Sequence, residues 1–93
     1  MQPPLSHFTC PDYWSLYRQL PLQARETANK CFALLKSDPT HPSLHLKKIG
    51  DLWSVRAGIH YRSIGMDAPG AEKGILWFWI GPHAAYDRLI KQG

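Results

Sequence analysis

The chain has 93 residues, which suits one compact domain, 1–93, and is too short for two. Hydrophobic residues make up 44% and include four tryptophans, so a core can form without metal or disulfide staples. The formal net charge is +4 with a pI near 9.3, which favours an acidic partner without identifying one. No apolar run approaches the ~20 residues that span a bilayer, and the first residues do not resemble a signal peptide. We therefore expect a soluble, cytoplasmic protein with no membrane partner.

The first half of the chain predicts one short strand and two helices. An extended piece at 5–9 is followed by a helix that begins at Pro11 and is stopped by Pro21. A second helix is predicted over 22–36, where apolar residues recur at helical spacing. The segment 37–43 holds two prolines and small polar residues, which is typical of a loop.

The second half changes to the periodicity of strands. Segments 44–50, 52–58 and 59–66 predict consecutive strands, the last two joined by a tight turn near Gly58. The continuous apolar run 75–80 predicts an interior strand, and 83–91 a short helix. The predicted fold class is α+β. Two N-terminal helices pack on one face of a curved antiparallel sheet of about four strands, and a short C-terminal helix follows.

No metal or cofactor site is evident in the sequence. Cys10 and Cys31 have no metal-ligand spacing, and we expect free or buried thiols, although one disulfide between them is also possible. The seven acidic residues are dispersed, with no carboxylate cluster to hold Mg²⁺ for a two-metal nuclease. Any phosphate chemistry here is therefore predicted to be metal-free, and no cofactor is expected.

The positive charge is concentrated in the middle of the chain. Between residues 41 and 62 a single acid, Asp51, is outnumbered by four cations: Lys47, Lys48, Arg56 and Arg62. A stripe of cations on one sheet face is stabilised when a phosphodiester chain binds and releases its counterions. The alternative is that the cations are solvated or form weak surface pairs with Asp51 or Asp67.

Arg56 and Arg62 are the strongest candidates for a site. They lie six residues apart across the predicted hairpin, so they fall on neighbouring strands. Two adjacent guanidiniums repel one another unless an anion joins them. We therefore predict a groove that holds a phosphate chain, with the four cations on one face. His60, between the two arginines in sequence, is a weaker candidate for the same groove.

His83 and Tyr86 follow the apolar strand, where the last helix begins. A histidine can exchange a proton near neutral pH, and a phenol can stack on a base or donate a hydrogen bond to phosphate. Because they are three residues apart, the two side chains share one face of the helix. The alternative is structural: His83 caps the helix and Tyr86 packs on the sheet.

In order and spacing, these segments resemble the RelE/ParE toxin superfamily, the toxins of type II toxin–antitoxin pairs. The most telling pieces are "HLKKIGDLWSVRAGIHYRSI" and "IGPHAAYDRL", and the resemblance covers nearly the whole chain. It implies a small α+β fold. For RelE-type members it also implies a metal-independent endoribonuclease that cleaves mRNA in the ribosomal A site. In that reaction the ribose 2′-OH attacks the adjacent phosphate, leaving a 2′,3′-cyclic phosphate and a 5′-OH. A cognate antitoxin protein is the implied partner, besides mRNA and the ribosome.

By position, the resemblance implies roles for particular residues. Arg62 matches the catalytic arginine of the family and Arg56 the basic residue of the preceding strand. His83 falls where members carry arginine or histidine, and Tyr86 falls near their C-terminal tyrosine. Lys47 and Lys48 match upstream lysines, which would hold messenger or ribosomal RNA.

Two other functions remain open at this stage. Toxins of the ParE kind poison DNA gyrase by protein contact and need no catalytic base. A toxin-like domain that binds RNA or a protein without cleaving anything would look similar. His83 and Tyr86 beside an arginine pair favour the nuclease.

Overall fold

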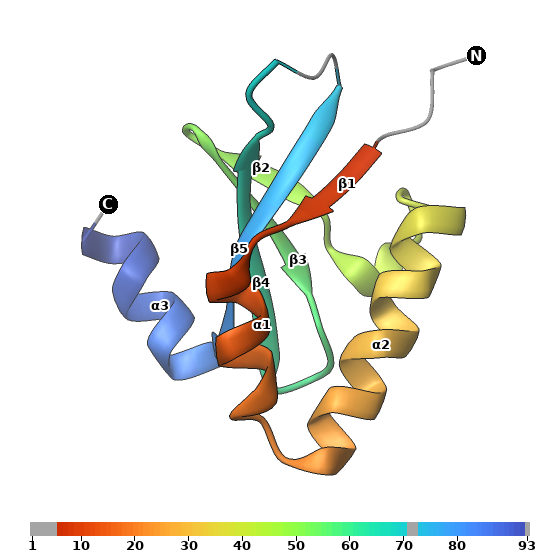
Figure 1. Ribbon diagram of the computed structural model, residues 1–93, viewed down its shortest axis with the longest axis vertical. Coiled ribbons are helices and arrows are strands. Elements are labelled where there is room, and N and C mark those ends of the chain that lie inside the picture. Colours follow the sequence, from red (N-terminus) through yellow and green to blue (C-terminus); the bar gives the residue numbers. More distant parts are fainter. Residues whose placement is uncertain (1–5, 71–72, 93) are drawn as a thin grey trace.

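Five strands and three α-helices build the part of the chain that the computed structural model describes, residues 6–70 and 73–92 (Figure 1). The N-terminal elements are β1 (Ser6–Thr9), α1 (Pro11–Arg18) and α2 (Leu22–Ser37). A 3₁₀ turn, η1 (Pro42–Leu44), then leads into β2 (Lys47–Ile49), β3 (Leu52–Arg56), β4 (Tyr61–Asp67), β5 (Gly74–Pro82) and α3 (His83–Gln92).

The strands form one sheet in the order β1-β5-β4-β3-β2. Strands β2 to β5 are antiparallel neighbours, which confirms the predicted α+β class. The sheet has five strands rather than about four and is mixed, because β1 pairs with β5 in parallel, Ser6 opposite Gly74. The predicted strand at 5–9 thus lies at the sheet edge as Ser6–Thr9; Leu5 is outside the described residues.

Prolines mark where the two N-terminal helices begin. Pro11 occupies the first turn of α1, where a missing N–H costs nothing. Pro21 lies at the N-cap of α2 and separates the two helices. Along α2, the buried residues Ala24, Ala28 and Leu35 recur at helical spacing. The predicted helix boundaries are therefore confirmed to within two residues.

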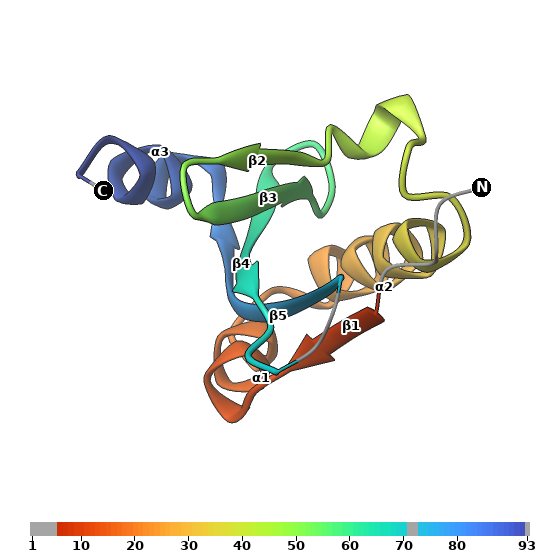
Figure 2. The same cartoon turned by 90° about the horizontal axis from the view of Figure 1, so that it is seen from above.

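Helices cover both faces of the sheet: the two N-terminal helices lie on one face, as expected, and α3 lies on the other. The hydrophobic core places α2 against the face that carries Val55 and Trp77. Helix α3 lies on the opposite face, because its Tyr86 reaches Ser54, the strand neighbour of Val55. Figure 2 shows α2 and α3 on opposite sides of the curved sheet.

The core lies mainly between α2 and the sheet. Its least exposed members are Leu35, Leu44, Ile75, Trp77 and Ile80, each exposed by 1% or less. The two cysteines are free and partly exposed, and the Cys10 thiol donates to the Trp77 carbonyl at 3.8 Å. Among the described residues, no helix is long and apolar enough to cross a membrane.

Replacing Leu35 by alanine tests the core directly. Leu35 is 1% exposed, so Leu35→Ala should lower the free energy of unfolding by about 3 kcal/mol through lost burial and the cavity left behind. Urea denaturation followed by circular dichroism measures the loss. Leu22→Ala on the same helix, at a side chain 61% exposed, is the matched control and should cost less than about 0.5 kcal/mol. Equal losses in both variants would contradict this packing.

Candidate functional site

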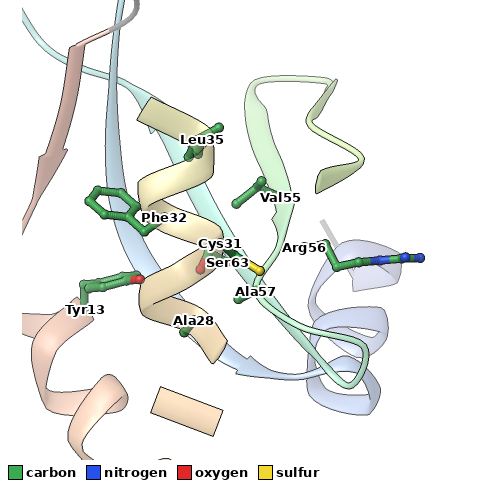
Figure 3. Close-up of a pocket in the computed structure, with 9 residues that line it drawn as sticks. All are labelled: Tyr13, Ala28, Cys31, Phe32, Leu35, Val55, Arg56, Ala57 and Ser63. Atoms are coloured by element: carbon green, nitrogen blue, oxygen red, sulfur yellow. The ribbon is translucent and has the colours of Figure 1, made fainter. Parts of the chain in front are cut away.

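Arg56 and Arg62 are directly opposed on neighbouring strands. They are Cα partners in the β3–β4 ladder, so their side chains leave the same face of the sheet. Figure 3 shows a pocket between α2 and β3, with room for about one water molecule, and the Arg56 side chain extends away from it. The guanidiniums therefore occupy the face opposite α2, which is the face of α3.

Neither guanidinium of the arginine pair forms an ion pair among the described residues. Burial lowers the pKa of Arg62, and the like charge of Arg56 lowers it further, while Tyr86 and Asp87 act in the opposite direction. Arg56 Nε is buried and has no hydrogen-bond partner in the described part of the chain. A bound anion would offset both the repulsion and the missing hydrogen bond.

Tyr86 brings Arg62 and His83 together. The Arg62 guanidinium carbon lies 6.0 Å from the centre of the Tyr86 ring, which is cation–π range. The rings of His83 and Tyr86 are 5.8 Å apart, centroid to centroid. The structure thus gathers Arg56, Arg62, His83 and Tyr86 on one face, as the sequence had indicated.

A buried hydrogen bond fixes Tyr86. Its hydroxyl lies 2.7 Å from Ser54 Oγ, and the two residues are only 6% and 2% exposed. Helix α3 is therefore anchored to the sheet at this point, and the Tyr86 hydroxyl is not free to contact a ligand. Sequence reasoning missed Ser54. The available signal was its spacing of two from Arg56, which places both side chains on the same face.

His83 is held by Asp87, one turn along α3. His83 Nδ1 lies 3.1 Å from Asp87 Oδ2, which fits an N–H donated to the carboxylate. In a neutral ring, this contact leaves His83 Nε2 as the proton acceptor. The pair was readable from its i, i+4 spacing, although sequence reasoning gave Asp87 no role.

The two lysines lie on different faces, which corrects the expectation that four cations share one. Lys47 pairs with Ser54 in the β2–β3 ladder and so lies on the arginine face. Lys48 pairs with Trp53 on the other face, where its Nζ lies 3.1 Å from Asp67 Oδ2. Asp67 also accepts a hydrogen bond from Trp53. This bond is the largest cause of the lowered pKa of Asp67, and the hydrogen bond from Lys48 is the second.

His60 contributes through its backbone. Its carbonyl oxygen accepts a hydrogen bond from the His83 N–H at 2.8 Å, which ties the β3–β4 turn to the start of α3. Its side chain is exposed beside Tyr61. Across residues 6–70 and 73–92, no group of three or more His, Cys, Asp or Glu side chains is placed to hold a metal ion.

Comparison with known proteins identifies the fold. No family model matches the sequence, and no curated protein matches it. Among solved structures, a chain of the archaeal RelE–RelB complex from Pyrococcus horikoshii superposes with a TM-score of 0.61 and 18% identity, over 85% of this chain and 94% of that one. A YoeB/ParE toxin from Agrobacterium tumefaciens superposes with a TM-score of 0.62 and 14% identity, over 85% of this chain and 99% of that one. The isolated RelE toxin of E. coli superposes with a TM-score of 0.58 and 14% identity, over 95% of this chain and 97% of that one.

These similarities extend over most of each chain, so the protein has the fold of the RelE/ParE toxin superfamily. The expectation about the fold is confirmed. At identities of 18% and below, the likeness establishes the fold and not the chemistry of the site.

A double-mutant cycle tests the anchor between Ser54 and Tyr86. Ser54→Ala strands the buried Tyr86 hydroxyl without a partner and should lower the free energy of unfolding by about 2 kcal/mol. Adding Tyr86→Phe removes the stranded group, so the double variant should lose clearly less than the sum of the single losses. Tyr17→Phe is the control, because the Tyr17 hydroxyl donates its hydrogen bond to Asn29 at an exposed site. Additive losses would show that the two hydroxyls do not interact.

Proposed function

We propose that this chain is the toxin of a type II toxin–antitoxin pair and that it cleaves mRNA as a metal-independent endoribonuclease. The observation that carries the proposal is the single cluster formed by Arg56, Arg62, Tyr86, His83 and Asp87 on a RelE-like fold. Two guanidiniums without ion pairs in the described chain lie near a histidine that a carboxylate orients, and cleavage of a ribose–phosphate link needs these groups.

The arginines bind and stabilise the phosphate. As the 2′-oxygen attacks, negative charge grows on the non-bridging oxygens of the phosphorane. Guanidiniums that already face that position stabilise the transition state more than the substrate, by an amount often near ~3 kcal/mol per donor. Their fixed positive charge supplies what a metal ion supplies elsewhere. Lys47, on the same face, extends the contact along the RNA backbone.

His83 is the general base in this proposal. Its Nε2 takes the proton from the ribose 2′-OH while Nδ1–H donates to Asp87, whose charge stabilises the imidazolium that forms. The 2′-oxygen then forms its bond to phosphorus as the bond to the 5′-oxygen breaks. The products are a 2′,3′-cyclic phosphate and, after protonation by solvent, a 5′-hydroxyl. Tyr86 acts as a positioning residue for Arg62 and His83, because its hydroxyl is already bound to Ser54.

The expected partners follow from the same proposal. The mRNA would be cut in the ribosomal A site, in the cytoplasm, and a cognate antitoxin would neutralise the toxin. An antitoxin partner is supported by the similarity in fold to a chain of the RelE–RelB complex of Pyrococcus horikoshii. Poisoning of gyrase in the manner of ParE, or binding without cleavage, would not require the contact between His83 and Asp87. Primer extension on mRNA from induced cells separates these functions: A-site cuts support cleavage, whereas gyrase-linked DNA breaks support poisoning.

Arg62→Ala should abolish toxicity with the fold intact. Loss of a guanidinium at the phosphate should slow cleavage by at least about 10²-fold. Growth after induction and primer extension on cellular mRNA measure the effect at matched protein levels. Arg18→Ala, at an exposed arginine in the last turn of α1, is the control and should remain toxic. Growth arrest by Arg62→Ala as strong as by the wild type would refute the assigned site.

His83→Gln should reduce cleavage about 10²- to 10⁴-fold while RNA binding changes little, because the amide cannot accept the proton. Asp87→Asn should give a smaller loss, since its amide oxygen can still accept the bond from Nδ1 but carries no charge. Single-turnover cleavage and fluorescence anisotropy with a non-cleavable RNA measure the two quantities separately. If His83→Gln lowers binding and cleavage by the same factor, His83 has no role in proton transfer.

A further inference from the structure

One tryptophan differs from the other three. Three indole N–H groups donate a hydrogen bond at 2.8 to 3.1 Å: Trp14 to Thr9, Trp53 to Asp67 and Trp77 to His7. In the described part of the chain, no group accepts a hydrogen bond from the fourth, Trp79. Trp79 is partly exposed, and an indole combines an aromatic face with a hydrogen-bond donor.

Trp79 lines a pocket of about 360 Å³ beside the candidate site. The pocket lies between the end of α1, the end of β5 and the start of α3, and its walls include Leu16, Leu20, Tyr61 and Ala85. Two lining residues adjoin the cluster in sequence: Tyr61 precedes Arg62, and Pro82 precedes His83. A third lining residue, Gly81, lies beside Arg62 on the neighbouring strand, so the pocket borders the arginine pair.

Gly81 determines how the indole lies. A Cβ at Gly81 would come within 2.6 Å of the Trp79 ring, so the ring rests directly against the backbone of this glycine. Gly81 is also the Cα partner of Arg62 in the β4–β5 ladder. The ring therefore lies along the strand next to the arginine, as one wall of the pocket. A side chain at position 81 would push the ring out of that position.

We propose that this pocket binds the nucleobase of the RNA nucleotide next to the cleaved phosphate. The inference rests on the proposed function, because the arginine pair supplies the phosphate position from which the base reaches the pocket. A base is flat and apolar on its faces and polar at its edge. The pocket is lined by the Trp79 indole, which can stack on a base, by the apolar side chains of Leu16 and Leu20, and by Gln19. The indole N–H and the Gln19 amide are the polar groups of these side chains. Stacking tolerates every base, while the two polar groups would favour bases with matching edges.

Binding to RNA that lacks one base tests the subsite. The probes are dye-labelled 2′-O-methyl oligoribonucleotides, which the enzyme cannot cut, each with one abasic position in turn, at low salt. Removing one particular base should weaken binding to the wild type about tenfold. We call this loss of affinity the abasic penalty. Trp79→Ala should bind the intact and abasic oligonucleotides equally, and Trp79→Phe, which keeps a smaller ring, should show an intermediate abasic penalty. Circular dichroism confirms that each variant is folded.

Trp14→Ala is the matched control, because Trp14 is an exposed tryptophan outside the pocket, and it should keep the full abasic penalty. The proposal is wrong if the wild type shows no abasic penalty, if it binds none of the oligonucleotides, or if Trp79→Ala keeps the penalty. In the last case the pocket contacts something other than a base, such as a protein segment.

Cleavage of unmodified mRNA separates this inference from the proposed function. If the wild type binds the abasic RNA more weakly in a Trp79-dependent way but cuts no mRNA, the subsite is supported and the catalytic proposal is refuted. If the wild type cuts mRNA but binds abasic and intact RNA equally, only the subsite is refuted.

Discussion

The site depends on the repulsion between two guanidiniums held on adjacent strands. The β3–β4 ladder opposes Arg56 and Arg62, and the described part of the chain provides no ion pair for either. Burial lowers the pKa of Arg62, and the like charge of Arg56 lowers it further. Folding tolerates the repulsion because the rest of the sheet fixes the register, and a bound anion would relieve it. The same contact that opposes folding thus favours an anionic ligand.

Helix α3 completes this surface through a small number of specific contacts. Tyr86 anchors it to Ser54, the His60 carbonyl holds its first N–H, and Asp87 orients His83. The first two contacts join the helix to β3 and to the β3–β4 turn, and the third lies within the helix. The position of His83 relative to the arginines is therefore determined by the sheet and by the β3–β4 turn, as well as by the helix itself.

The solved structures that share this fold include toxins alone and in complex with antitoxins. At 18% identity or less, such similarity leaves room for different side chains on the same backbone. In this chain the fold carries a histidine oriented by a carboxylate and a tryptophan-lined pocket beside it. In the proposed cleavage, the histidine would serve as the general base and the pocket would hold the neighbouring nucleotide.

The sequence by itself determined the elements and the arginine pair. Prolines and apolar periodicity gave the helix limits, and the short hairpin placed Arg56 and Arg62 on neighbouring strands, because these signals act over a few residues. The opposite facing of Lys47 and Lys48 was also readable from the sequence, because adjacent residues of a strand point to opposite faces. Only the tertiary structure decided the parallel pairing of β1 and the side on which α3 lies. It also joined Ser54 to Tyr86 and left the Trp79 indole facing a pocket. These outcomes depend on the exact register and on contacts between distant segments, and a local pattern of residues carries no information about either.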